Sequence, residues 1–120
     1  MLKLNSQLDE RKPMYYIYII RCNDNSLYTG ITTNLKKRIS EHYFKTKESA
    51  KYTRARDIVS VEVLWMAKNR SDASKLEYTL KKLTKQKKEA LILNPKLLCD
   101  DRYTLHEHIT LQQCISDYQK

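Results

Sequence analysis

Three polar side chains in this sequence occur at spacings that could serve phosphate chemistry. Arg38 and His42 are four residues apart, so on a helix they share one face and can both reach one phosphate group. Glu77 falls between Ala73 and Leu80 in an i, i+4, i+7 pattern, which puts its carboxylate at the edge of an apolar helical face. A carboxylate in that position needs a partner, because burying an unpaired charge is costly.

A small set of strands and helices must position these residues. The sequence predicts strands over residues 14–20, 27–31 and 58–67, and helices over residues 35–46, 71–86 and 87–93. Turn formers at residues 23–26 make the first two strands a hairpin. Asn34 is a good N-cap for the first helix, and Ser71 with Asp72 supplies a start for the second. Residues 45–56 hold five basic residues and little apolar periodicity, which predicts an exposed loop.

These elements predict one α/β (α+β) domain over residues 14–93, with a three-stranded, mainly antiparallel sheet flanked by helices. Residues 1–13 are expected to form an N-terminal arm. Residues 94–120 are expected to form a helical C-terminal extension, because Thr104 and Glu107 have the spacing of a capping box.

The charge of the chain indicates a nucleic-acid partner. The formal net charge is +9, and residues 11–98 carry 20 basic and 8 acidic side chains. A domain this basic repels itself unless an anionic partner offsets the charge. No stretch has the apolar character of a membrane-binding or membrane-spanning helix. We therefore expect DNA as the partner and no membrane contact.

Glycine and cysteine usage excludes other classes of site. Gly30 is the only glycine, so a glycine-rich phosphate-binding loop cannot be built. The three cysteines form no C-x-x-C pair, which argues against a disulfide framework and against a thiolate zinc site. Free thiols, together with an N-terminus that lacks a signal-peptide core, predict a cytoplasmic protein.

Taken in order, the candidate residues resemble the GIY-YIG nuclease domain over roughly Tyr15 to Ile92, and the resemblance is strongest to the small stand-alone bacterial members. The residues that carry it are Tyr16-Ile17-Tyr18, Tyr28-Thr29-Gly30, Arg38, His42 and a helical Glu77. The first motif has Tyr16 in place of glycine and the second has Thr29 in place of isoleucine. Several relatives carry a lysine just after the second motif, where this chain has Ile31 and Thr32.

The resemblance implies hydrolysis of DNA phosphodiester bonds with one divalent metal ion, Mg²⁺ or Mn²⁺, held by Glu77. Such an ion keeps several waters, so one carboxylate suffices when a substrate phosphate completes its shell. Arg38 would neutralise charge in the transition state. Tyr18 or Tyr28 would take the proton of the attacking water, and His42 would relay or orient that proton. A free phenol has a pKa near 10, so we expect the site to lower it through Arg38, the metal and His42.

If Tyr18 and Tyr28 belong to one site, the hairpin loop between their strands must have an odd number of residues. Strand alternation places Tyr28 on the face of Tyr18 only if the loop has an odd number of residues, such as 23–25 with Cys22 opposite Ser26. A two-residue loop would put the tyrosines on opposite faces.

Six basic side chains are the predicted nucleic-acid contacts: Lys47, Lys51, Arg54, Arg56, Lys81 and Lys85. The missing lysine motivates an alternative function, a non-catalytic nucleic-acid-binding module with the same fold. A weaker alternative is a nuclease directed at RNA. The extension over residues 94–120 is predicted either to pack on the domain or to mediate self-association. The sequence leaves open whether the DNA is single-stranded, duplex or branched.

Overall fold

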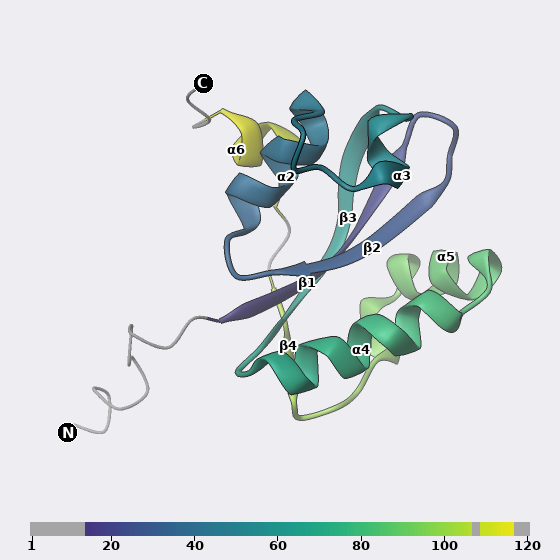
Figure 1. Cartoon of the computed structure of the whole chain (residues 1–120). Helices are drawn as coiled ribbons and strands as arrows, with labels where there is room; N and C mark the ends of the chain where they lie inside the picture. The colour runs from purple at the N-terminus through teal and green to yellow at the C-terminus, as the bar shows by residue number, and fades with distance from the viewer. Residues whose placement is uncertain (1–13, 107–108, 117–120) are drawn as a thin grey trace, which may run out of the picture.

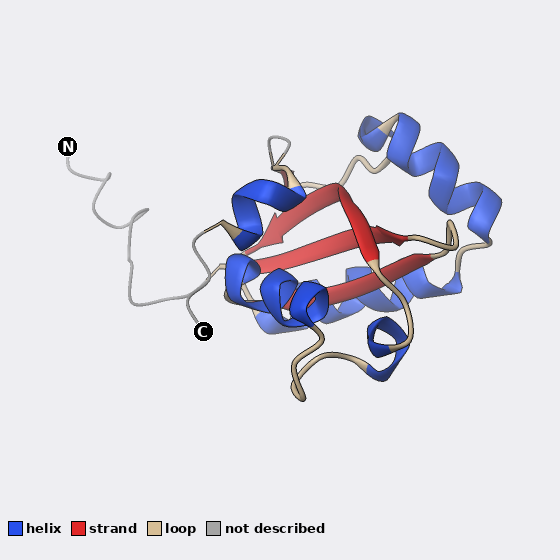
Figure 2. Cartoon of the chain, turned by 90° about the horizontal axis from the view of Figure 1, so that it is seen from above, coloured by secondary structure: helices blue, strands red, loops and turns tan. Residues whose placement is uncertain are grey.

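The computed structural model describes residues 14–106 and 109–116, and it shows a twisted sheet with helices on both faces (Figures 1 and 2). The strands are β1 (Tyr15–Cys22), β2 (Leu27–Thr32), β3 (Ile58–Ala67) and β4 (Tyr103–Leu105). Their order in the sheet is β2-β1-β3-β4, and every neighbouring pair is antiparallel. The predicted α/β class is confirmed, and β4 adds a fourth strand to the three expected.

The helices are α2 (Leu35–Phe44), α3 (Lys51–Arg54), α4 (Arg70–Lys82), α5 (Lys85–Leu93), a 3₁₀ turn (Pro95–Leu97) and α6 (Leu111–Ile115). Asn34 caps α2 as predicted, by accepting a hydrogen bond from the backbone N–H of Lys37. Helix α4 begins slightly before the predicted start, because Asn69 is its N-cap. Within residues 14–106 and 109–116, no helix is long and apolar enough to cross a membrane.

The hairpin between β1 and β2 has the predicted three-residue loop. Ile20 pairs with Tyr28 and Arg21 with Leu27, which puts Cys22 opposite Ser26. The backbone N–H of Cys22 donates to the carbonyl of Ser26 at 2.9 Å, and Asn25 closes the turn with a φ of 70°. Asparagine is one of the few residues that adopts this left-handed conformation readily, so the loop sequence suits the odd length.

Alternation along β1 divides the core between the two faces of the sheet. Ile17 and Ile19 pack against the apolar sides of α4 and α5. Tyr18 and Ile20 face the other way and pack against α2 and α6. Figure 2 shows the helices on the two sides of the sheet. The candidate residues of β1 and α2 therefore share one face, whereas Glu77 of α4 comes from the other.

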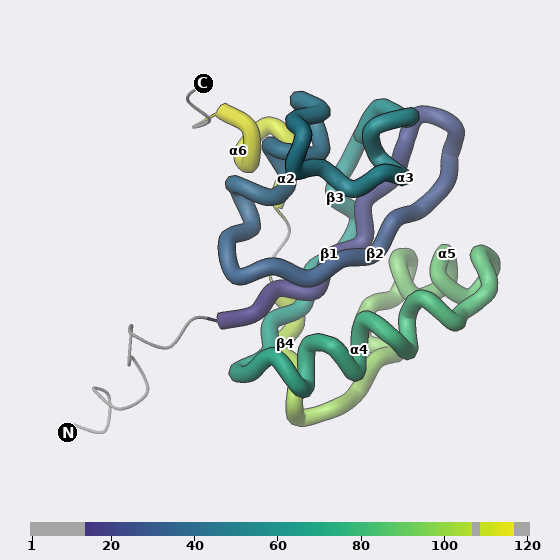
Figure 3. Tube along the Cα trace, viewed as in Figure 1, coloured from purple at the N-terminus to yellow at the C-terminus, as the bar shows by residue number. Residues whose placement is uncertain are grey.

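The C-terminal segment differs in part from its prediction. Thr104 lies in β4, which pairs with the outer edge of β3, so it does not begin a helix. The capping box forms instead at Thr110 and Gln113, at the start of α6. Glu107 lies outside the described residues. Figure 3 shows α6 beside α2, where the hydroxyl of Ser40 donates to the carbonyl of Cys114 at 3.2 Å.

Candidate active site

Tyr18 lies on the face of the sheet that α2 and α6 cover, and its ring crosses the edge strand β2. It is buried, and it lies directly opposite Gly30 of β2. A Cβ atom at residue 30 would lie 2.6 Å from Cζ of Tyr18 and closer still to the hydroxyl oxygen. Only glycine therefore lets the ring pass over β2. Because β2 is the edge strand, the Tyr18 ring is directed toward the rim of the sheet, where it stays buried.

Tyr28 lies on the same face, as the odd loop requires. It pairs with Ile20, and its ring centroid is 6.5 Å from that of Tyr18 and 5.3 Å from that of His42. On its other side Tyr28 contacts Tyr52, with centroids 5.6 Å apart. The structure thus brings both motif tyrosines and His42 into one cluster.

His42 is enclosed within this cluster. Its Nε2 atom is 2.8 Å from the Tyr18 hydroxyl, and its Nδ1 atom is 2.8 Å from the Thr53 hydroxyl. The side chain has no exposed surface. The expectation that His42 reaches a phosphate beside Arg38 is therefore wrong, because α3 and the tyrosines cover the ring. Among the described residues, the two ring nitrogens of His42 contact the hydroxyls of Tyr18 and Thr53.

Burial governs the protonation of both partners. Burial raises the pKa of Tyr18 above its ordinary value, and Tyr28 and Glu77 add to the rise, while Arg38 opposes it. The lowering of the phenol pKa expected from Arg38 is present, but it is smaller than the effect of burial. Burial, followed by the positive charge of Arg38, lowers the pKa of His42 to about 4. Both groups are neutral at neutral pH.

Arg38 is fixed at the border of the cluster. Its Nη1 atom donates to Oε1 of Glu41 at 2.9 Å and to the carbonyl of Glu48 at 2.6 Å. Glu41 is buried and also pairs with Lys37 at 2.5 Å. These contacts hold the guanidinium of Arg38, which remains partly exposed, within electrostatic reach of Tyr18.

Glu77 approaches from α4, which packs against β2 and β1 on the opposite face. Its side chain is 23% exposed, and it forms an ion pair with Lys81 at 3.2 Å. The negative charge of Glu77 contributes to the raised pKa of Tyr18, after burial and Tyr28.

The donor set at this rim suits one kind of ion. Among residues 14–106 and 109–116, no cluster of three or more His, Cys, Asp or Glu side chains could enclose a metal. A partly exposed single carboxylate instead fits a hard divalent ion that keeps most of its waters. Glu77 is therefore compatible with Mg²⁺ or Mn²⁺ and unsuited to a fully protein-bound metal.

Three residues of the cluster were missed by sequence reasoning. Glu41 has the i+3 and i+4 spacing to Arg38 and Lys37 that favours helical ion pairs, and this signal could have identified it. Tyr52 and Thr53 lie in α3, within the segment predicted as an exposed loop. No periodicity marks them, because one short helical turn has none.

The predicted nucleic-acid contacts fall into two groups. Lys47, Lys51 and Arg54 are exposed in and near α3, which follows α2. The other three are engaged in ion pairs: Arg56 with Asp24 at 2.9 Å, Lys81 with Glu77 at 3.2 Å, and Lys85 with Glu89 at 2.6 Å. The guanidinium of Arg56 also lies 3.9 Å from the ring centroid of Tyr52.

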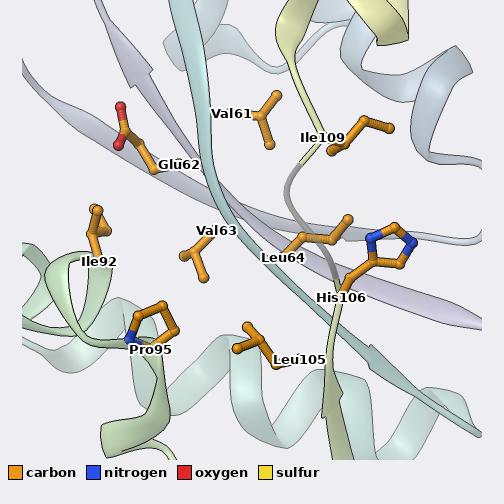
Figure 4. A pocket seen from close by; sticks show the side chains of 9 residues that line it. All are labelled: Val61, Glu62, Val63, Leu64, Ile92, Pro95, Leu105, His106 and Ile109. Atoms are coloured by element: carbon orange, nitrogen blue, oxygen red, sulfur yellow. The ribbon is translucent and has the colours of Figure 1, made fainter.

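A separate pocket of about 360 Å³ lies along β3, away from these residues (Figure 4). Val61 and Val63 of β3 line it together with Pro95, Leu105 and other residues of the C-terminal segment. None of the predicted site residues belongs to it. The candidate active site is thus the rim around Tyr18 and not this apolar pocket.

Comparison with known proteins gives a consistent result. A family model described as the GIY-YIG catalytic domain matches residues 14–90. UPF0213 protein DP2720 of Desulfotalea psychrophila is 43% identical over 81 residues, which cover 68% of this chain and 73% of the relative. UPF0213 protein CPE1444 of Clostridium perfringens is 42% identical over 90 residues, which cover 75% and 94%. The solution NMR structure of UPF0213 protein BH0048 from Bacillus halodurans is 36% identical, covers 67% of this chain and 83% of that chain, and has a TM-score of 0.41.

Proposed function

The chain belongs to the GIY-YIG family, a nuclease family, and from this premise we propose that it is an endonuclease that hydrolyses DNA phosphodiester bonds with a divalent metal ion. The supporting observation is the surroundings of the Tyr18 hydroxyl. It is hydrogen-bonded to His42, and the charges of Arg38 and Glu77 both act on it. A proton acceptor, a fixed cation and a ligand for a hard ion are the groups that this hydrolysis needs.

We assign to Tyr18, and not to Tyr28, the role of accepting the proton of the attacking water. The reason is that the Tyr18 hydroxyl is hydrogen-bonded to a proton acceptor, Nε2 of His42. As the water oxygen bonds to phosphorus and the bond to the leaving oxygen breaks, a water proton moves to Oη of Tyr18. The proton of Tyr18 moves at the same time to Nε2 of His42. No tyrosinate is required beforehand, which suits a phenol with a raised pKa.

The protonation of His42 completes the cycle. With a pKa of about 4, its Nε2 atom is unprotonated at neutral pH and can accept the proton. The leaving alkoxide takes a proton from solvent water. His42, being a weak base, then returns its proton through Tyr18 to solvent, and both side chains regain their starting states.

Arg38 stabilises the charge on the phosphate. Glu41 and the carbonyl of Glu48 use only the Nη1 atom of its guanidinium for the contacts described above. Arg38 also hydrogen-bonds the Tyr18 side chain, and the N–H groups that remain can bind a phosphate oxygen.

Glu77 would hold the divalent ion. The chemistry that the ion supplies when bound is neutralisation of phosphate charge and polarisation of the phosphorus–oxygen bonds. Glu77 would then give up its ion pair with Lys81, a partly exposed pair of the kind that contributes little to stability. Lys81 would be released toward the substrate backbone.

Substrate binding is assigned to the exposed residues Lys47, Lys51 and Arg54, which lie next to the helix that carries Arg38 and His42. Contacts of this kind bind phosphates without regard to sequence. A preference for single-stranded, duplex or branched DNA would depend on the shape of this surface.

The test is cleavage of labelled single-stranded, duplex and branched DNA in Mg²⁺ or Mn²⁺. Glu77→Gln keeps the size of the side chain and removes its charge, so we expect a loss of roughly a hundredfold or more in cleavage rate with DNA binding retained. Asp101→Asn is the matched control, because this exposed carboxylate lies outside the site. It should cleave as the unchanged protein does.

The same experiment decides on the alternative, a binding module without turnover. The ion pair of Glu77 with Lys81 favours that alternative, since it is the contact that a purely structural glutamate would make. Tight, salt-sensitive DNA binding without cleavage of any DNA in either metal would support the binding module and contradict the nuclease. Cleavage of RNA alone would reassign the substrate.

A further inference from the structure

The hydrogen-bond chain behind Tyr18 ends at Thr53, a residue to which the proposed reaction gives no role. The Thr53 hydroxyl is 2.8 Å from Nδ1 of His42 and donates to the carbonyl of Ala50 at 3.1 Å. Thr53 is fully buried. Its single hydroxyl group therefore joins the imidazole to the backbone at the start of α3.

The direction of each hydrogen bond follows from the carbonyl at the end of the chain. A carbonyl oxygen can only accept, so the proton of the Thr53 hydroxyl is used on Ala50. The Thr53 oxygen must then accept from Nδ1–H of His42. A neutral imidazole carries one proton, so Nε2 is bare and accepts from the Tyr18 hydroxyl.

We propose that Thr53 is a positioning residue that fixes His42 in the Nδ1–H tautomer, so that Tyr18 donates its proton inward to Nε2 and keeps its oxygen lone pairs for Arg38, which donates to that oxygen, and for a water molecule at the rim. The tautomer follows from the hydrogen bonds alone. Its consequence for cleavage rests on the proposed function, because only a Tyr18 oxygen with a free lone pair can take a proton from water.

The opposite tautomer would reverse the direction of the hydrogen bond between His42 and Tyr18. With the proton on Nε2, His42 would donate to the Tyr18 oxygen, and the Tyr18 hydroxyl would have to point its own proton toward the rim. The tyrosine could then donate to a water but could not pass a proton to His42. A buried polar group that selects between these states changes the rate of proton transfer without touching the substrate.

The position of Thr53 is well supported for such a role. Tyr52, its neighbour in α3, packs against Tyr28 on the sheet. Arg56, just after the helix, stacks on Tyr52, donates to its carbonyl at 3.1 Å and pairs with Asp24 of the hairpin loop. These contacts attach α3 to the β1–β2 hairpin and hold the Thr53 hydroxyl at one place beside His42.

The test compares Thr53→Val with Thr53→Ser. Valine has the shape of threonine without the hydroxyl, and serine keeps the hydroxyl. The matched control is Thr29→Val, the same chemical change at a buried threonine whose hydroxyl has no hydrogen-bond partner among the described residues. The tautomer is read directly from the imidazole ¹⁵N shifts and couplings of His42 by NMR. Cleavage rate and DNA affinity are measured on the same samples.

We expect Nδ1–H in the unchanged protein and in Thr53→Ser and Thr29→Val, and a shift toward Nε2–H in Thr53→Val. Cleavage should fall by at least roughly tenfold in Thr53→Val, with DNA affinity unchanged and the rate restored in Thr53→Ser. Should Thr53→Val fail to fold, the unchanged protein and Thr53→Ser still report the tautomer.

Three results would overturn the inference. An Nε2–H tautomer in the unchanged protein would contradict the hydrogen-bond directions. An unaltered tautomer in folded Thr53→Val would remove Thr53 as its cause. A shifted tautomer with an undiminished cleavage rate would refute the positioning role. Absence of cleavage by the unchanged protein would refute the proposed function instead, and the NMR comparison would still decide whether Thr53 fixes the tautomer.

Discussion

His42 illustrates how burial sets the charge of a group that solvent does not reach. The protonated imidazole would need a compensating negative charge, and burial together with Arg38 disfavours it more than Glu41 favours it. The titratable and charged side chains that contact the ring or act on its charge come from β1, β2 and α2: Tyr18, Tyr28, Arg38 and Glu41. Burial therefore keeps His42 neutral well into the acid range in the folded protein.

This lowered pKa makes the stability of the fold depend on pH. The unfolded chain protonates His42 below its ordinary pKa of about 6.5, whereas the folded protein does so only below about 4. The contribution of His42 to the free energy of unfolding is therefore complete above about pH 6.5. It is lost as the pH falls to about 4, by up to about 3 kcal/mol. Urea unfolding at several pH values should show this loss.

The control for this prediction is His42→Gln, which removes the titrating group. Its free energy of unfolding should start lower but change less between about pH 6.5 and 4. The same slope in both proteins would show that His42 does not cause the pH dependence.

Substitution of the two tyrosines tests which of them accepts the proton. Tyr18→Phe removes the hydroxyl that is hydrogen-bonded to His42, so we expect cleavage to fall by roughly a hundredfold or more with DNA affinity retained. Tyr28→Phe keeps the ring contacts with His42 and Tyr52 and should cost less. Single-turnover cleavage rates provide the measurement. A larger loss in Tyr28→Phe than in Tyr18→Phe would exchange the roles that we assign.

At the residue scale, the sequence predicted the members of the cluster better than their surroundings. Tyr18 and Tyr28 stand in recognisable motifs, and the odd hairpin loop placed them together. The enclosure of His42 could not be predicted, because it depends on α3 folding back over α2. For the same reason Thr53 carried no signal: a threonine in a polar segment becomes a hydrogen-bond partner only when the chain brings it to the ring.

At the scale of elements, β2 does more than complete the hairpin. As the edge strand it forms the rim over which Tyr18 passes, and Gly30 is the residue that permits the passage. The need for glycine here arises from the close approach of a ring, since Gly30 has no positive φ. Strand register and side-chain size together place the phenol between the two faces of the sheet.

Gly30→Ala tests this arrangement. The added methyl group would overlap the Tyr18 phenol and push it from His42, so we expect a loss of stability of about 1–3 kcal/mol, as for other overpacked cores. Cleavage should fall with it, because the Tyr18–His42 hydrogen bond is displaced. Chemical unfolding and cleavage rates are the measurements. Full stability with full activity would show that the rim tolerates a side chain.

Most of the elements could be predicted from local patterns. Alternation of apolar and polar residues specifies β3, and Asn34 caps α2 as predicted, whereas α4 is capped by Asn69 and not by the predicted Ser71. The strand β4 could not be predicted, because three residues are too few for a pattern and its formation depends on the free edge of β3. The capping-box spacing at Thr104 was misleading for this reason: pairing with β3 uses the backbone of that segment.

At the scale of the whole molecule, only part of the net charge of +9 is available to bind a polyanion. Many cations are used within the fold, as when Arg21 joins Glu62 of β3 and Glu89 of α5. Lys51 and Arg54 of α3 are exposed and form no ion pair with other described residues. The charge that remains for a polyanion therefore includes the helix beside the active site, and not only the summed excess of the chain.

The dependence of DNA binding on salt separates this local surface from the overall charge. Removing two phosphate contacts with Lys51→Ala and Arg54→Ala should weaken duplex binding and reduce the slope of log affinity against log salt by about 2. Lys68→Ala with Lys96→Ala is the charge-matched control, because both lysines are exposed without a described ion pair and lie in the loop before α4 and the 3₁₀ turn after α5. Each double variant lowers the net charge by the same amount. If only overall charge attracts DNA, the two slopes will change equally. A change confined to the α3 variant would place the DNA backbone across α3, beside the hydroxyl of Tyr18.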